Sequence, residues 1–411
     1  MSEEKIEKTE GENFSMRDQF HIPRENGKKL VYFCGNSLGL QPKSTKYLIR
    51  QELEDWKNLG VEGHFNAQNP WFKYHHFFKG AAKLVGAKEK EVVLMNSLSV
   101  NLHLMLVSFY RPKGNRYKIM MEAGAFPSDQ YAVESQVKFH GYDYDDAVIE
   151  VQPRKGEHCL RPEDILDEIH KHKEELALVL FSGVQYYTGQ FFDLKSITKA
   201  AHEAGALAGF DLAHAAGNVP LQLHDWQVDF AVWCTYKYLN SGPGAVGGVF
   251  VHEKHGKNKE LPRFAGWWGN AESERFKMKK GFVPQEGAAG WQLSNAQVFN
   301  MIAHKASLEL FNEAGMEKLR VKSLQLTGLL EQLIQDNPGL EIITPKDPGQ
   351  RGCQLSILTG KNGKKIFEEM RKQGIIADWR EPNVIRVAPV PMYNTEEEVR
   401  QFAKIINKIN A

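Results

Sequence analysis

An acid and a lysine each follow an apolar segment of the chain, and together they could hold one ligand. Asp211 comes directly after the apolar run 207–210, and Lys237 comes shortly after the run 229–234. If both runs are strands of one open sheet, both side chains emerge at the edge where such sheets place their binding sites. An amine can form a Schiff base with a carbonyl carbon, and a carboxylate can keep a ring nitrogen protonated. Either residue alone is more simply a turn cap or a solvated side chain, whereas the pair indicates a shared site.

This pair is what pyridoxal 5'-phosphate (PLP) requires. The lysine would bind the cofactor and move protons, while the acid would keep the pyridine ring electron-withdrawing. The phosphate needs hydrogen-bond donors, and segment 96–101 offers the Ser99 hydroxyl and free backbone N–H groups where a helix begins. The same segment could be an ordinary serine cap. Phe126 opens the next strand-to-helix connection, where its ring could stack on the pyridine or simply belong to the core.

The elements that must position these residues alternate along the chain. Short apolar runs, with helices between them, predict strands at 91–95, 118–121, 176–181, 207–210, 229–234 and 247–251. This alternation is typical of an α/β fold in which a mostly parallel sheet is covered on both faces.

The pattern changes after residue 294. A long helical stretch to about 337 is followed by strands near 341–344, 353–357 and 384–388, with helices at 364–373 and 395–410. We therefore expect an N-terminal extension (1–28), a large PLP-binding domain (29–300) and a small C-terminal α+β domain (301–411). The first segment of the large domain is expected to contribute to the small domain or to an interface.

Composition and charge exclude several classes of protein. The 411 residues are 42% hydrophobic and 25% charged, which is ordinary for a globular protein. The net charge of +1 gives no field that would attract nucleic acid or a membrane surface. The polar start of the chain resembles neither a signal nor a transit peptide, and no apolar segment is long enough to span a bilayer. The cysteines have no metal-ligand spacing, so we expect a cytoplasmic protein with a small-molecule substrate and no metal.

Several motifs match a known group of enzymes. GFDLAHAAGN (209–218) and TYKYLNSGPG (235–244) resemble the fold-type I, aspartate aminotransferase-like PLP enzymes. The fuller set is similar to the kynureninase family and extends over nearly the whole chain after the first two dozen residues. It includes FCGNSLGLQP (33–42), AFPSDQYAVESQ (125–136), GVQYYTGQFFDL (183–194) and IRVAPVPMYN (385–394).

The resemblance implies an activity and a set of site residues. The family hydrolyses L-kynurenine or 3-hydroxy-L-kynurenine to anthranilate or its 3-hydroxy form plus L-alanine, in tryptophan catabolism and NAD biosynthesis. Catalytic roles are implied for Lys237, Tyr236 and Asp211. Cofactor contacts are implied for Leu98, Ser99, Phe126, Pro127, Ser128, Asp129, Ser182, Asp211, His214, Tyr236, Lys237, Trp267 and Asn295. Ser99 departs from the threonine that is common in the family, but the hydroxyl is kept.

Arg386 is the candidate for binding the substrate's α-carboxylate. A guanidinium within the apolar run 384–388 suggests a bidentate anionic partner, although an edge-strand arginine that reaches water is an alternative. The resemblance implies that Ser37, His64, Trp267 and Asn295 surround the substrate's aromatic ring, some of them across the interface of a homodimer. His64 together with Asn295 favours the 3-hydroxylated substrate, because a histidine could pair with the hydroxyl.

Two other functions remain open. One is another PLP reaction on the same scaffold, by an aminotransferase or a cysteine desulfurase. A desulfurase needs a mobile cysteine, whereas Cys353 lies in a strand-like context. The other is a non-catalytic PLP-binding protein, against which Arg386 and Tyr236 argue.

Overall fold

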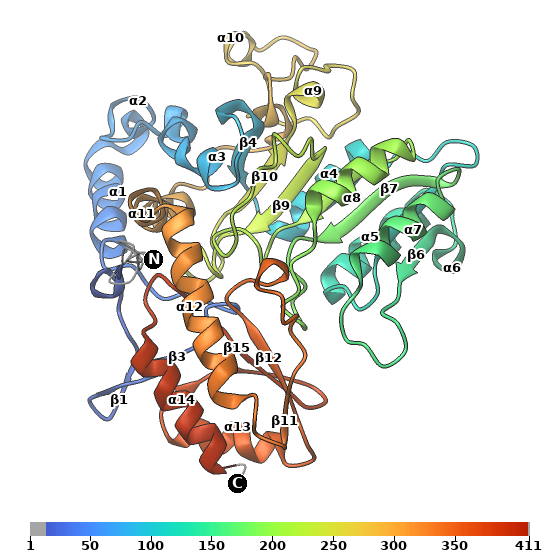
Figure 1. The fold of residues 1–411 in the computed structure, drawn as a ribbon. Helices are drawn as coiled ribbons and strands as arrows, with labels where there is room; N and C mark the ends of the chain where they lie inside the picture. The colour runs from blue at the N-terminus through green and yellow to red at the C-terminus, as the bar shows by residue number, and fades with distance from the viewer. Residues whose placement is uncertain (1–13, 410–411) are drawn as a thin grey trace, which may run out of the picture.

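The computed structural model describes residues 14–409 (Figure 1). Their largest sheet has seven strands. Its order is β4-β10-β9-β8-β7-β5-β6. Neighbouring strands from β6 to β9 pair in parallel, and β10 runs antiparallel to both β9 and β4. The strands are β4 (Val92–Met95), β5 (Lys118–Glu122), β6 (Val148–Val151), β7 (Leu176–Ser182), β8 (Leu207–Asp211), β9 (Phe230–Cys234) and β10 (Gly247–Val251). The predicted mostly parallel α/β sheet is confirmed.

Both faces of this sheet are buried. Successive side chains of a strand point to opposite faces, so Ile119 and Met121 pack in one hydrophobic cluster and Met120 packs in another. This two-sided burial explains why the strands read as continuous apolar runs rather than alternating ones. The ring of Phe230 on β9 packs over Gly209 of β8, where an added Cβ would be 2.1 Å from the ring. The connecting helices include α4 (Leu98–Phe109), α5 (Pro127–Phe139), α7 (Pro162–Lys171) and α8 (Leu194–Glu203).

A second, antiparallel sheet lies in the C-terminal part of the chain. Its order is β11 (Leu340–Ile342), β12 (Leu355–Thr359), β15 (Val384–Val387) and β14 (Asp378–Arg380). One hydrophobic cluster joins this sheet to α12 (Met316–Ile334), α13 (Gly363–Lys372) and α14 (Glu396–Ile409). A separate strand pair joins β3 (Val31–Tyr32) in parallel to β13 (Ile375–Ile376), so the start of the described chain lies beside its end. The exact division into domains stays a prediction.

The helical stretch predicted at 294–337 is two helices. α11 (Val298–Ala314) ends at Gly315, whose φ of 76° ends the helix, and α12 follows directly. The other elements are η1 (Arg17–Gln19), β1 (Arg24–Glu25), β2 (Lys28–Lys29), α1 (Thr45–Leu59), η2 (Gly60–Glu62), α2 (Gly63–Asn66), η3 (Trp71–Phe78), α3 (Gly80–Leu84), η4 (Glu89–Glu91), α6 (Tyr144–Ala147), α9 (Glu253–Gly256), α10 (Glu272–Arg275), η5 (Ala288–Trp291) and η6 (Pro348–Gln350). Among residues 14–409, no helix is long and apolar enough to cross a membrane.

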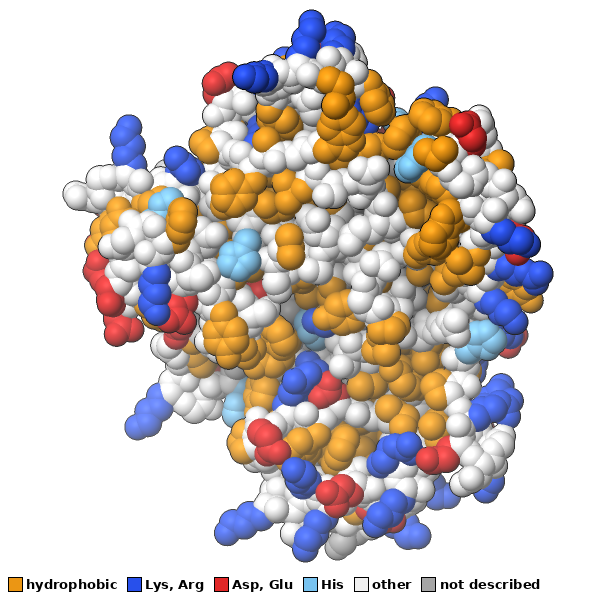
Figure 2. Space-filling model, turned by 180° about the vertical axis from the view of Figure 1, so that it is seen from behind, with side chains coloured by type: hydrophobic (Ala, Val, Ile, Leu, Met, Phe, Trp, Pro, Cys, Tyr) orange, Lys and Arg blue, Asp and Glu red, His pale blue; other side chains and the backbone are white. Residues whose placement is uncertain are grey.

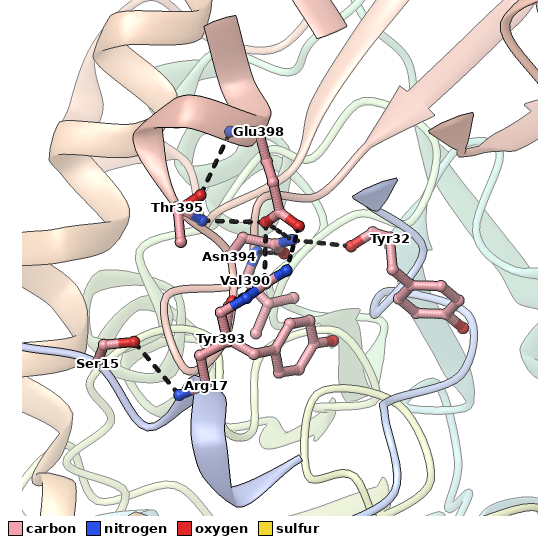
Figure 3. A network of polar contacts seen from close by, with 8 residues as sticks. All are labelled: Ser15, Arg17, Tyr32, Val390, Tyr393, Asn394, Thr395 and Glu398. Carbon is pink, nitrogen blue, oxygen red and sulfur yellow. Dashed lines mark hydrogen bonds and ion pairs between the residues drawn. The ribbon is translucent and has the colours of Figure 1, made fainter. Parts of the chain in front are cut away.

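The expected N-terminal extension packs against the C-terminal part from residue 14 onward, and residues 1–13 lie outside the described chain. Arg17 forms an ion pair with Glu398 at 2.8 Å and donates to the carbonyl of Tyr393 at 2.6 Å (Figure 3). Glu398 also accepts from Asn394 and from the backbone of Thr395, at the start of α14. This network anchors the N-terminal segment to the end of motif 385–394.

Candidate active site

A cavity of about 180 Å³ lies at the carboxyl ends of β7 and β8. Most of the candidate cofactor residues line it. The lining consists of Leu98, Ser99, Phe126, Ser128, Asp129, Ser182, Val184, Tyr186, Asp211, Ala213, His214, Tyr236 and Lys237. Asp211 ends β8, Ser182 ends the neighbouring β7, and the two residues lie opposite each other in the sheet. The parallel sheet therefore brings together residues that are far apart in sequence.

Lys237 is nearly buried and faces a histidine. Its Nζ atom lies 3.1 Å from His214 Nε2, and 5.5 Å and 5.8 Å from the ring centroids of Phe126 and Tyr236. Burial and the charge of Lys237 hold the pKa of His214 well below its usual range, so this imidazole is neutral and can accept from the ammonium. His214 Nδ1 is buried and has no hydrogen-bond partner within residues 14–409.

Asp211 and Asp129 form a pair of buried carboxyl groups. Burial raises the pKa of both, the two groups hydrogen-bond to each other, and the charge of Lys237 favours their ionised forms. The pKa of Asp129 lies well above its usual value, so we place the shared proton on Asp129. Asp211 also accepts from the backbone N–H of Ala213 at 2.6 Å. The pair thus carries one negative charge beside the positive charge of Lys237.

The start of α4 forms the part of the cavity suited to an anion. Asn96 has a left-handed φ of 48°, and its side chain donates to Asn101, which in turn donates to the carbonyl of Met95 at 2.8 Å. These bonds fix the turn between β4 and α4. The first N–H groups of α4, at Leu98 and Ser99, carry the positive end of the helix dipole, which favours a phosphate.

The turn that contains Ser37 packs against the backbone of the site but does not line the cavity. The N–H of Gly39 donates to the carbonyl of Tyr236 at 2.8 Å. A Cβ added at Gly39 would lie 2.3 Å from the carbonyl oxygen of Lys237. This close approach explains why the sequence has glycine at that position.

Arg386 does not line the cavity, but it contacts a residue that does. Its side chain, 1% exposed, donates to the carbonyl of Tyr186 at 2.7 Å and forms an ion pair with Asp378 of β14. Its Nε atom is buried and has no partner among the described residues. Tyr186 itself lines the cavity and contacts the ring of Phe126 edge-on at 5.1 Å. Nε is therefore the one nitrogen of the guanidinium that these two partners leave without an acceptor.

Four other candidates do not line the cavity. The ring of His64 stacks on Phe72 at 4.4 Å, and Trp267 contacts Phe276, which also contacts Phe72. His64 and Trp267 thus belong to a separate aromatic cluster. Asn295 lies on an exposed loop, and Pro127 is the exposed first residue of α5.

Several residues at this site were not predicted from the sequence. Tyr186 and Val184 lie within the quoted motif 183–194, so the motif itself was the signal. Glu122 ends β5, just as Asp211 ends β8, and an acid after an apolar run could have identified it. Asp378 lies in a strand of three residues, which is too short to give a pattern.

One group outside the cavity has the residue types of a metal site. Glu91, His224 and His252 have ligand atoms within 4.8 Å of one another. The two imidazole rings stack at 4.9 Å with an angle of 8° between their planes, so an ion in the plane of one ring would lie out of the plane of the other. Glu91 instead accepts a hydrogen bond from His224 at 2.9 Å.

PLP fits the cavity residues. Lys237 offers an amine, Asp211 offers a charge for the ring nitrogen, and the start of α4 offers donors for the phosphate. Phe126 supplies an aromatic face, and the unpartnered His214 Nδ1 is a buried polar atom that a ligand can satisfy. Each part of the cofactor thus has a complementary group.

Comparison with known proteins agrees with this chemistry. Residues 319–406 match the family model of the kynureninase C-terminal domain. The chain is 56% identical to a kynureninase from Myxococcus xanthus, with 95% of this chain and 92% of that protein covered. It is 52% identical to a kynureninase from Flavobacterium psychrophilum, with 95% and 94% covered. The fold is similar to a cysteine desulfurase from Thermococcus onnurineus, with a TM-score of 0.76, 17% identity, and 92% and 94% of the two chains covered.

Proposed function

We propose, from the premise that this chain belongs to the kynureninase family, that it hydrolyses L-kynurenine or 3-hydroxy-L-kynurenine to anthranilate or 3-hydroxyanthranilate plus L-alanine. It is a PLP-dependent hydrolase of a carbon–carbon bond. The observation that carries the proposal is the buried grouping of Lys237, Asp211 and Asp129 in one cavity.

PLP, when bound, withdraws electrons from the substrate's α-carbon and so makes the neighbouring bonds easier to break. Asp211 holds its negative charge at the end of β8, where it can keep a ring nitrogen protonated. Lys237, once its amine is free, can take the proton from the α-carbon and return it. Neutral His214, 3.1 Å from Nζ, accepts a hydrogen bond from the protonated lysine. Burial raises the pKa of Tyr236, so its phenol stays neutral and can donate a hydrogen bond.

Arg386 is proposed to bind the substrate's α-carboxylate. Two partners, the carbonyl of Tyr186 and the carboxylate of Asp378, hold the guanidinium next to Tyr186, which lines the cavity. The unpartnered Nε supports the role, because a buried guanidinium donor without an acceptor is costly. The choice between the two substrates rests on His64 and Asn295, which favour the 3-hydroxylated one.

We also propose that the protein is a homodimer with shared active sites. His64, Trp267 and Asn295 lie outside the cavity of their own chain, which supports a contribution to the partner's site. A groove of about 780 Å³, whose lining includes Leu38, Gly39 and Phe299, lies beside the turn that packs on Lys237. Figure 2 shows further hydrophobic patches on the face behind that of Figure 1. The cytoplasm is the proposed location, because Cys34, Cys159, Cys234 and Cys353 are all free thiols.

No observation favours the two other PLP reactions. Cys353 is fully buried, and burial raises its pKa to about 12, so it is not the accessible, reactive thiol that a desulfurase requires. An aminotransferase would use the same lysine and acid, so only the products separate it from a hydrolase.

The proposal is tested by incubating the purified enzyme with each kynurenine in turn. We expect equal amounts of the anthranilate product and alanine, and the faster reaction with the 3-hydroxylated substrate. Transamination without carbon–carbon cleavage would contradict the proposal. Borohydride treatment should attach the cofactor to Lys237 alone, and Lys237→Ala should abolish this labelling. Labelling of another lysine would show that the anchor is wrongly assigned.

A further inference from the structure

Glu122 is a buried acid beside the cavity that has no part in the reaction described so far. It ends β5, is 2% exposed and does not line the cavity. Its carboxylate accepts from the Ser182 hydroxyl at 2.5 Å and from the Ser182 backbone N–H at 3.2 Å. Ser182 does line the cavity. Glu122 therefore lies one hydrogen bond away from any ligand that contacts Ser182.

The proton on Glu122 decides what Ser182 can offer. A serine hydroxyl has one proton and two lone pairs. When Glu122 is ionised, its carboxylate accepts the hydrogen bond from the serine hydroxyl, so only the lone pairs of Oγ remain for the cavity. When Glu122 is neutral, its own proton can be donated to Ser182 Oγ, and the serine proton is free for the ligand. The cavity wall thus accepts a hydrogen bond in one state and donates one in the other.

We propose that Glu122 is a positioning residue that selects, through Ser182, whether the cavity accepts a hydrogen bond from the bound cofactor or donates one to it. The identity of the cofactor rests on the proposed function. Lys237, Asp211 and the start of α4 are assigned to its carbonyl carbon, ring nitrogen and phosphate, which leaves the phenolic oxygen for Ser182. A donating Ser182 stabilises the phenolate, and an accepting Ser182 stabilises the protonated phenol.

The surroundings of Glu122 place its ionisation, and with it the reversal of the hydrogen bond to Ser182, near neutral pH. Burial raises the pKa of Glu122 to about 7, the hydrogen bonds from Ser182 oppose this rise, and the charge of Asp211 adds to it. Among the described residues, the charged groups in this region include Asp211 from β8, Asp129 from the start of α5 and Lys237 after β9, whose charge acts on both aspartates. Because the pKa is raised, Glu122 is neutral below about pH 7 and ionised above it. Ser182 therefore donates at lower pH and accepts at higher pH.

Glu122→Gln in the holoenzyme tests this directly. The glutamine amide cannot ionise and donates to Ser182 Oγ at every pH, so it mimics neutral Glu122. We expect the visible absorption band of the bound cofactor to titrate about one pH unit lower, because the phenolate is then stabilised throughout. Glu150→Gln is the matched control, since Glu150 lies on the neighbouring β6 and, within residues 14–409, its side chain accepts only from Tyr144. A titration in Glu122→Gln that matches the wild type would overturn the proposal.

A second measurement does not depend on the reaction or on the folding of that variant. Infrared difference spectra of the wild-type holoenzyme should show a buried carboxyl band that is lost with a midpoint near pH 7. In Ser182→Ala this midpoint should rise by about one pH unit, because the hydrogen bond that stabilises the ionised form is gone. An unchanged midpoint would refute the coupling, whereas failure to cleave kynurenine would refute only the proposed function.

Discussion

Arg386 is held in place before any substrate arrives. Asp378 and the carbonyl of Tyr186 together occupy two of its nitrogens, and its charge is almost fully buried. A planar guanidinium can keep both partners and still present another donor, which the compact ammonium of a lysine cannot do with the same geometry. Replacing Arg386 by lysine keeps the positive charge but removes this geometry. The replacement therefore distinguishes a specific role in carboxylate binding from a general need for positive charge.

We therefore expect Arg386→Lys to lower kcat/KM by about 10- to 100-fold, because a charge-assisted hydrogen bond of about 1.5–3 kcal/mol is lost. The change should appear mostly in KM, since the carboxylate contact exists before and during the reaction. Steady-state kinetics would measure it. Arg380→Lys is the control: Arg380 also pairs with Asp378 at 3.1 Å but is more exposed, so its effect should be small. Equal losses in both variants would contradict the role.

The site residues that could be predicted are those that follow a recognisable local pattern in the sequence, namely a polar residue after an apolar strand. Asp211 and Lys237 follow long apolar strands, so their position at the sheet edge could be predicted. The raised pKa of Asp129 could not be predicted, because it depends on burial and on the approach of Asp211 from another element. The same holds for Glu122, whose pKa is set by burial and by Ser182, sixty residues away.

At the scale of elements, α1 holds the segment that carries His64. Glu52 of α1 is fully buried, and its carboxylate accepts from Asn69 at 3.0 Å, from the indole of Trp71 at 3.0 Å and from the hydroxyl of Tyr74 at 2.8 Å. Trp71 contacts the ring of His64 edge-on at 5.3 Å. One acid thus fixes the loop and, through Trp71, the orientation of the histidine.

Glu52→Gln should lower the free energy of unfolding by about 1–3 kcal/mol. The substitution replaces one carboxylate oxygen by an NH2 group, which cannot accept the hydrogen bonds that this oxygen now receives. Urea unfolding would measure the loss. Glu54→Gln is the control on the same helix. Glu54 is exposed and, among the residues that the structure describes, pairs only with Lys57, so the effect should stay within about 0.5 kcal/mol. A Glu52→Gln protein as stable as the wild type would show that these bonds contribute little.

Long strands were easier to predict than short ones for a physical reason. The central strands are buried on both faces and therefore consist of apolar runs, as at β9 and β10. β13 and β14 have two and three residues, and β13 pairs with β3 from the other end of the chain. Such a pairing depends on tertiary packing and leaves no periodic pattern in the sequence.

At the scale of the whole molecule, the cavity of a single chain lacks several of the expected substrate contacts. His64 and Trp267 lie in their own aromatic cluster, and Asn295 lies on an exposed loop. In a symmetric dimer each interface contact occurs twice, so a residue missing from one site can be supplied by the partner. Each of the two sites would then combine the cavity of one chain with the aromatic cluster of its partner.

Mixing two inactive variants tests this arrangement. Lys237→Ala removes the cavity's lysine, and the double variant Trp267→Ala with Asn295→Ala removes the residues expected from the partner. If the sites are shared, a mixed dimer has one intact site. Random exchange of subunits makes about half of the dimers mixed, so about a quarter of the wild-type activity should return after unfolding and refolding the mixture. Refolding each variant alone is the control. If the mixture gives no more activity than these two controls together, both sets of residues act within one chain.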